Sequence, residues 1–117
     1  MARLYSHIKN KEKGDCMKSA GNLIMDIEDA LLVHAVIEGQ GKLKGRKILH
    51  AWVEINGYVL DFSNGRHFCM KKENYYALAK PSFMRKYSQE TALKFMDSTG
   101  HFGTWEEGFE NGKTFKK

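Results

Sequence analysis

Apolar residues near the start of the chain recur at intervals of three and four positions. They are Cys16, Ala20, Leu23, Ile24 and Ile27. This spacing places the side chains on one face of a helix. Gly14-Asp15 predicts where the helix begins, because aspartate is a favourable N-cap whose charge suits the positive end of the helix dipole. The acidic cluster at positions 26–29 predicts the turn out of the helix.

Three short segments further along have the pattern of β-strands. Residues 30–37 form a continuous apolar run rich in β-branched side chains, and residues 48–55 and 58–62 alternate between apolar and polar. Asn56-Gly57 separates the last two segments, and this dipeptide favours a two-residue type I′ hairpin turn. The first sixty residues therefore predict one helix followed by three strands.

The hairpin turn also predicts which side chains share a face of the sheet. With a two-residue turn, Trp52 lies opposite Asp61. Side chains alternate along a strand, so His50, Trp52 and Glu54 share one face. Asp61 is expected on that face, one diagonal step from His50, with the Cβ atoms about 7 Å apart or less. The other face is apolar and is expected to form the core. Its members are Leu49, Ala51, Val53, Ile55, Tyr58, Leu60 and Phe62.

The second half of the chain has weaker patterns. Residues 68–79 are compatible with a strand or a helix, and Pro81 ends whichever is present. A second helix is predicted from position 89 to about position 97. Ser88 is its expected N-cap and Gly100 its expected stop.

The two ends of the chain are expected to contribute little to the core. Residues 1–13 are polar and basic, and residues 106–117 have the composition of a fraying tail. Just before that tail, the rings of Phe102 and Trp105 are predicted to pack against the body. A chain of 117 residues is long enough for one core without disulfides, so we expect a single domain over residues 1–117.

Three reactive side chains are predicted to meet between the helix and the hairpin. Asp61 beside His50 would fix the tautomer of the imidazole and stabilise its protonated form. The other ring nitrogen would then accept a proton from a thiol. Cys16 lies where the first helix begins, and both a helix N-terminus and a nearby imidazolium favour the thiolate, which is the nucleophilic form. The pattern predicts a Cys-His-Asp site.

These residues resemble the transglutaminase-like core of the papain-like cysteine enzymes. The resemblance rests on Gly-Asp-Cys opening a helix, then His-Ala-Trp-Val-Glu, Asn-Gly and Val-Leu-Asp-Phe-Ser, and it covers about residues 14–65. It implies an α+β fold in which a helix carrying the cysteine packs on a small antiparallel sheet. It also implies acyl-transfer chemistry through a thioester, namely hydrolysis, deamidation or transamidation of amides in a protein or peptide substrate. Cys16, His50 and Asp61 match the family's catalytic residues in order and context.

The surroundings of the triad are less specific. The pairing of tryptophan with cysteine that is typical of many transglutaminases is absent, because the neighbours of Cys16 are Asp15 and Met17. Tyr5 and Asn10 are candidates for the side chain that completes an oxyanion hole. Trp52 is expected to form a wall of the substrate cleft, with simple packing as the alternative.

Composition favours a cytoplasmic protein but leaves its partners open. The chain has two cysteines, no signal-peptide pattern and no stretch near the ~18 apolar residues of a membrane span. The net charge of +5 suits an acidic partner, and nucleic acid is the weaker alternative because the aromatic residues show no RNA-binding pattern. A second hypothesis is therefore an inactive papain-like module that holds an acidic protein or nucleic acid through its basic loops.

Other polar residues are given structural roles. Glu54 is expected to face solvent near the turn, His34 to be structural and Cys69 to pack in a strand or helix. His67 and Cys69 lie two residues apart, but no ligand spacing typical of zinc is present. We expect neither a metal nor a cofactor.

Overall fold

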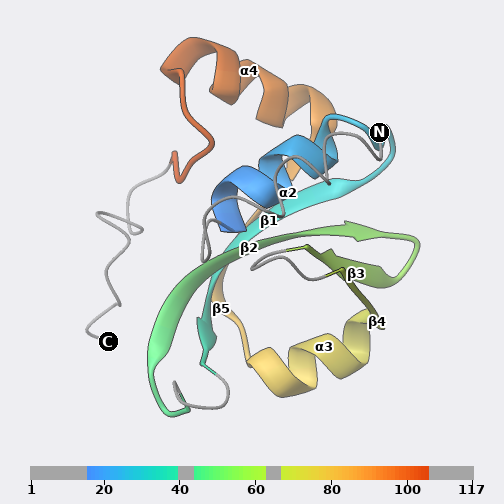
Figure 1. Cartoon of the computed structure of the whole chain (residues 1–117), viewed down its shortest axis with the longest axis vertical. Coiled ribbons are helices and arrows are strands. Elements are labelled where there is room, and N and C mark those ends of the chain that lie inside the picture. Colours follow the sequence, from blue (N-terminus) through green and yellow to red (C-terminus); the bar gives the residue numbers. More distant parts are fainter. Residues whose placement is uncertain (1–15, 40–43, 63–66, 106–117) are drawn as a thin grey trace.

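The computed structural model describes residues 16–39, 44–62 and 67–105 and has an α+β fold. The elements follow one another as α2 (Cys16–Ile24), β1 (Leu31–Glu38), β2 (Lys47–Ile55), β3 (Tyr58–Asp61), β4 (Phe68–Lys71), α3 (Lys72–Ala79), β5 (Ser82–Ser88) and α4 (Gln89–Thr99). The strands form one antiparallel sheet in the order β4-β3-β2-β1-β5. Figure 1 shows α2 and α4 on one side of this sheet and α3 on the other.

The β2–β3 hairpin has the predicted turn and register. Asn56 and Gly57 both have positive φ, at 53° and 82°, as a type I′ turn requires. Ile55 pairs with Tyr58, and two further pairs follow in step. The predicted register is therefore confirmed for the part of β3 that pairs with β2.

Both faces of the sheet are covered, which corrects the prediction of one apolar and one polar face. The face under α2 and α4 includes the buried residues Cys16, Ala20, Leu23, Ile24, Leu32, Ala51, Val53, Tyr87 and Ala92. The face under α3 includes Val33, Ala35, Ile37, Trp52, Val59, Tyr75 and Ala79. Tyr58, predicted to lie in the core, is 42% exposed. Side chains of β2 therefore point alternately into two cores, and the core under α3 also contains polar residues.

Local signals located the helix ends in the second half of the chain. The Ser88 side chain accepts a hydrogen bond from the Thr91 backbone N–H at the start of α4, and Gly100 ends this helix in a left-handed conformation. The ambiguous segment 68–79 contains both a strand, β4, and a helix, α3. No pattern in the sequence predicted β5. It pairs with β1 and so becomes an edge of the sheet.

The segment after α4 packs back on the body, as predicted. The Trp105 ring stacks on Phe95 with centroids 5.0 Å apart, and Phe102 lies against Gly21, where an added Cβ would come within 2.5 Å of the ring. Trp105 also contacts the ring of the buried His34. His34 is thus a core residue, in agreement with its predicted structural role.

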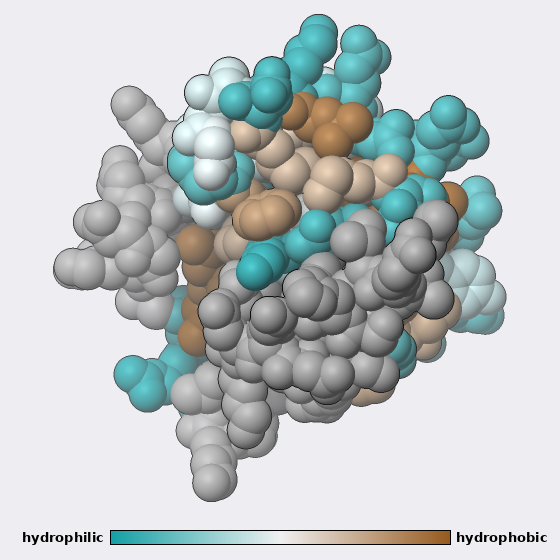
Figure 2. Space-filling model, turned by 45° about the horizontal axis from the view of Figure 1, so that its top comes forward, coloured by the Kyte–Doolittle hydropathy of each residue, from teal (hydrophilic) through white to brown (hydrophobic). Residues whose placement is uncertain are grey.

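The surface of the described residues carries scattered apolar side chains. Those at least a third exposed are Met25, Leu31, Tyr58, Phe68, Leu78, Phe83 and Leu93. Figure 2 shows apolar residues bordered by hydrophilic ones on the side that it presents. Some exposed apolar surface is usual for a folded domain. Among the described residues, no helix has the length and apolar character needed to cross a membrane.

Candidate functional site

Cys16 is the first residue of α2 and is largely buried. It is 8% exposed and belongs to the core between α2 and the sheet. Its Sγ lies 3.9 Å from the backbone oxygen of Leu49, the residue before His50 on β2. The backbone N–H groups in the first turn of a helix have no partner within the helix. The sulfur is therefore held beside β2, at the positive end of the helix dipole.

His50 and Asp61 form a direct hydrogen bond between neighbouring strands. Nε2 of His50 lies 2.8 Å from Oδ2 of Asp61, and the two side chains are 13% and 9% exposed. An ionised carboxylate only accepts hydrogen bonds, so Nε2–H is the donor. This bond leaves Nδ1 of the ring for another partner.

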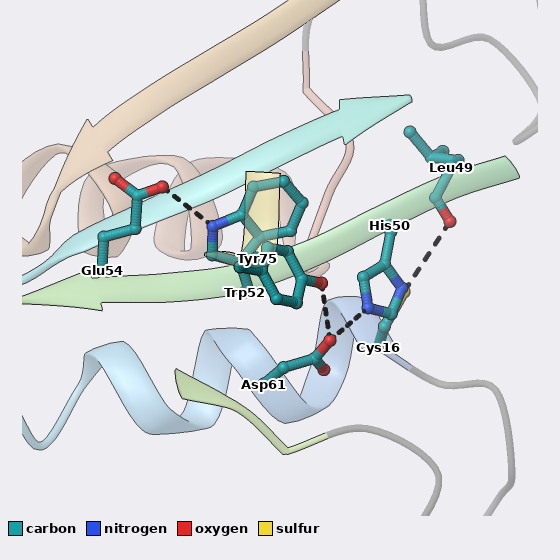
Figure 3. A network of polar contacts seen from close by, with 7 residues as sticks. All are labelled: Cys16, Leu49, His50, Trp52, Glu54, Asp61 and Tyr75. Carbon is teal, nitrogen blue, oxygen red and sulfur yellow. Dashed lines mark hydrogen bonds and ion pairs between the residues drawn. The ribbon is translucent and has the colours of Figure 1, made fainter. Parts of the chain in front are cut away.

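Cys16 lies next to this ring, and its side chain contributes to the raised pKa of His50. Figure 3 shows the imidazole between the Asp61 carboxylate and the sulfur. The three predicted residues, which come from α2, β2 and β3, therefore lie in contact in the order Cys-His-Asp.

The limited pairing of β3 explains how α2 reaches a residue on the opposite face of the sheet. Among the described residues, β3 pairs with β2 only at Val53–Ile55. The part of β2 that carries His50 lies beyond these pairs. The start of α2 packs against this part of β2, as the contact between Cys16 and the Leu49 carbonyl shows. The sulfur can thus meet an imidazole that belongs to the α3 side.

The electrostatic environment favours a protonated His50. Burial by itself lowers the pKa of His50, but the hydrogen bonds with Asp61 and Cys16 and the negative charges of these groups outweigh burial. Together they raise the pKa of His50 from its ordinary value near 6.5 to about 10. An imidazolium beside a thiol stabilises the thiolate. His50 therefore carries a positive charge next to the Cys16 side chain at neutral pH.

This shift predicts that stability depends on pH. In a Cys16→Ser variant, we expect the free energy of unfolding to fall as the pH rises above about 6.5. In the folded variant the hydrogen bond and the charge of Asp61 act to retain the His50 proton against the effect of burial, whereas the unfolded chain releases the proton. The stabilisation is complete below the unfolded pKa and is lost as the pH rises through the folded pKa, which is about 10 in the wild type. Urea unfolding at several pH values should show a slope of up to about 1.4 kcal/mol per pH unit.

The serine background is needed because a thiol exchanges a second proton with solvent in the same pH range. Without the charge of Cys16, the folded pKa of His50 will lie below about 10. The pH range over which stability falls will therefore be narrower than the wild-type pKa indicates. A second variant that also carries His50→Gln should lose the slope. If the free energy of unfolding of this second variant still falls with pH, a group other than His50 causes the dependence.

Tyr75, which sequence analysis left without a role, belongs to the same cluster. Its hydroxyl donates a hydrogen bond of 2.7 Å to Oδ2 of Asp61, the oxygen that also accepts from His50. Tyr75 is 7% exposed and lies on α3. No local pattern marks it, because it lies fourteen residues after Asp61 in a segment whose structure was ambiguous.

A second polar network lies next to the first and corrects the prediction for Glu54. Glu54, predicted to face solvent, is 5% exposed. Its carboxylate accepts hydrogen bonds from Trp52 Nε1 at 3.0 Å, from the Tyr76 hydroxyl and from Lys86 Nζ at 3.1 Å. Trp52, for which the sequence allowed a cleft wall or simple packing, is fully buried and packed, with its ring centroid 5.0 Å from that of Tyr75. It is a core residue, because α3 covers the face that we expected to be open.

The charge of Glu54 is stabilised inside this network. Burial alone raises the pKa of Glu54, but the hydrogen bonds from Tyr76, Trp52 and Lys86 outweigh burial and lower it. The carboxylate is therefore ionised at neutral pH and paired with Lys86. Because three donors already bind the Glu54 carboxylate, we assign this network a structural role.

The remaining predictions have mixed outcomes. Tyr5, Asn10 and Asp15 lie outside the described residues. Cys69 is in a strand, as one alternative had it, but it is exposed instead of packed. His67 lies against the ring of Phe62, with centroids 4.5 Å apart. Within the described part of the chain, no group of three or more His, Cys, Asp or Glu side chains is placed to hold a metal ion.

Comparison of the chain with protein-family models, with curated proteins and with solved structures found no match.

Proposed function

We propose that this protein is a cysteine-dependent enzyme that hydrolyses or transfers amide bonds, with Cys16 as nucleophile. The observation that carries the proposal is the arrangement of three side chains, in which His50 lies between Cys16 and Asp61. The Cys16 thiol at a helix N-terminus meets His50, and Nε2 of His50 donates to Asp61 at 2.8 Å. A nucleophile, a base and a group that orients the base are the minimum set for covalent acyl transfer.

The proposed reaction has two halves. Sγ of Cys16 attacks the carbonyl carbon of an amide as a thiolate whose proton already lies on Nδ1 of His50, since the raised pKa of His50 keeps this ring protonated. The carbon–nitrogen bond then breaks, His50 gives the proton to the leaving amine, and a thioester remains on the sulfur. A water molecule or an amine next transfers a proton to His50 and attacks the thioester. The carbon–sulfur bond breaks, the sulfur leaves as a thiolate, and the proton stays on His50.

The environment of the site supports each step. Asp61 stabilises the imidazolium that forms when His50 takes the proton. The backbone N–H of Cys16 is in the first turn of α2 and can donate to the oxyanion of the tetrahedral intermediate. The free thiol at Cys16 suits a reducing compartment such as the cytoplasm.

The papain-like, transglutaminase-like class is part of the same proposal. It is supported by the helix that begins at the cysteine, the antiparallel sheet and the placement of His50 and Asp61 on neighbouring strands. The substrate class that goes with it is a protein or peptide carrying a carboxamide or peptide bond. The net charge of +5 favours an acidic substrate or partner.

Alkylation by iodoacetamide tests the proposal, because thiol reactivity and solvent accessibility predict opposite orders of labelling for the two cysteines. Cys69 is exposed and Cys16 is buried, so accessibility alone favours labelling of Cys69. An ordinary thiol with a pKa of about 8.5 is protonated and slow at about pH 6. We expect Cys16 to react first at this pH. Mass spectrometry of tryptic peptides measures both rates in one sample.

Single-cysteine variants complete this experiment. Cys69→Ser reports Cys16 alone, and Cys16→Ser reports Cys69 alone. Labelling of Cys69 at about pH 6 that is as fast as labelling of Cys16, or faster, would contradict an activated thiol at Cys16. It would favour the inactive binding module with the same fold.

A further inference from the structure

The Asp61 carboxylate is held from a third element of the fold. The Tyr75 hydroxyl and the His50 Nε2–H both donate to Oδ2 of Asp61, at 2.7 Å and 2.8 Å. Figure 3 shows the two donors approaching this oxygen from different directions. Two donors on one oxygen restrict rotation of the carboxylate about its Cβ–Cγ bond. Oδ2 thus stays directed at His50.

The fold gives Tyr75 little freedom to leave this position. β4 pairs with β3 so that Asp61 lies opposite Phe68, and α3 follows β4 directly. The backbone N–H of Lys72 donates to the Gly57 carbonyl at 2.9 Å, which ties the start of α3 to the hairpin turn. The Tyr75 ring also packs on Trp52. The hydroxyl is therefore fixed by the same hairpin that carries His50 and Asp61.

From this geometry we propose that Tyr75 is a positioning residue of the site. Its hydroxyl orients Asp61, and Asp61 in turn orients His50 so that Nδ1 faces the sulfur of Cys16. The inference rests on the proposed function and adds a residue of α3 to the site formed by α2, β2 and β3.

The charges around Tyr75 are consistent with a permanent donor. Burial, then the charge of Asp61 and the hydrogen bond to it, and then the charges of Cys16 and Glu54 raise the pKa of Tyr75. The hydroxyl therefore keeps its proton at all physiological pH values. The ionisable groups that act on His50 are Asp61 from β3 and Cys16 from α2. Tyr75 acts on His50 only through Asp61.

The neighbouring tyrosine provides a matched control. Tyr75 and Tyr76 are consecutive on α3, and each donates its hydroxyl to a buried carboxylate. Tyr75 donates to Asp61 in the site, whereas Tyr76 donates to Glu54 in the second network. Tyr75→Phe and Tyr76→Phe therefore make the same chemical change, and only the first touches the Cys-His-Asp cluster.

In Tyr75→Phe, we expect alkylation of Cys16 at about pH 6 to slow about tenfold to a hundredfold, because misplaced reacting groups lose rate steeply. We also expect NMR titration of the His50 ring to show a pKa below the wild-type value of about 10, since the bond to Asp61 that raises it is loosened. Tyr76→Phe should leave the rate within about twofold and the His50 titration unchanged. A merely structural role would not separate the two variants in this titration.

Two further measurements keep the test decisive. Thermal unfolding by circular dichroism establishes that each variant is folded under the assay conditions. In an Asp61→Asn background, Tyr75→Phe should have no further effect on the His50 titration, because Tyr75 acts through Asp61. An unchanged or raised His50 pKa in Tyr75→Phe, or equal effects in both tyrosine variants, would overturn the proposal. The NMR titration needs no turnover, so this result is independent of whether the proposed activity is found.

Discussion

A protein in which glutamine replaces His50 is expected to form an acyl-enzyme at Cys16 about a thousandfold more slowly than the wild type. Glutamine can still donate a hydrogen bond to Asp61, which lies 2.8 Å from Nε2 in the wild type. It cannot accept the thiol proton or carry a positive charge beside the sulfur. The substitution therefore removes the base while preserving much of the local packing. Stopped-flow release of p-nitrophenol from p-nitrophenyl acetate, with detection of the acetylated protein by mass spectrometry, measures the rate.

A second histidine variant controls for general effects. His67 lies against Phe62 and is exposed, so His67→Gln makes the same chemical change outside the cluster. It should leave the acylation rate within about twofold of the wild type. Cys16→Ala should show no acetylated protein, and Cys69→Ala should acylate normally. Equal rates in wild type and His50→Gln would show that His50 is not the base.

The largest loss of stability is expected for Trp52→Ala, at about 3 to 5 kcal/mol in the free energy of unfolding. Trp52 is fully buried, and its ring lies against Tyr75 and Tyr76 with centroids 5.0 and 6.3 Å away. Truncation leaves a cavity between β2 and α3. It also removes the Nε1 donor of the buried Glu54 carboxylate, which adds the cost of an unsatisfied charged group. Urea unfolding at neutral pH measures the difference.

The other tryptophan is the natural comparison. Trp105 is partly buried at the edge of the opposite core, where it stacks on Phe95. Its replacement by alanine should cost about half as much or less, because neighbours or water can occupy part of the space. A smaller loss for Trp52→Ala than for Trp105→Ala would contradict the assignment of Trp52 to the centre of the core under α3.

Local sequence signals predicted the parts of this protein that depend on few residues. Asn56-Gly57 specified a tight turn, because this pair adopts the positive φ angles at low cost, and the turn set the register of β2 and β3. Ser88 and Gly100 marked the ends of α4 in the same way, through a side-chain cap and a left-handed residue. Such features survive in the folded protein because the energy that favours them comes from adjacent residues.

The contact between His50 and Asp61 followed from that register. Once the turn length is known, alternation along a strand decides which side chains share a face. The two residues therefore had to lie within one diagonal step, and the structure brings them to 2.8 Å. Cys16 is a different case. Its position at a helix start was predictable, but its place beside His50 depends on how α2 packs on β2, which no local pattern indicates.

The environment of these residues was decided only by tertiary structure. Nothing in the local pattern indicates that α3 covers the face carrying Trp52 and Glu54, because a polar face on a strand usually predicts exposure to solvent. β4 pairs with β3 and places α3 there, and this burial makes Trp52 a core residue and Glu54 the centre of a network. The same arrangement brings Tyr75 to Asp61.

The sequence by itself thus determined the hairpin, its register and the order of a cysteine, a histidine and an aspartate along the chain, since turn chemistry and side-chain alternation act over a few residues. The tertiary structure alone decided which face is covered and which distant hydroxyl supports the aspartate. These outcomes depend on how β4 and α3 pack against β3 and β2, and packing between distant segments leaves no local pattern in the sequence.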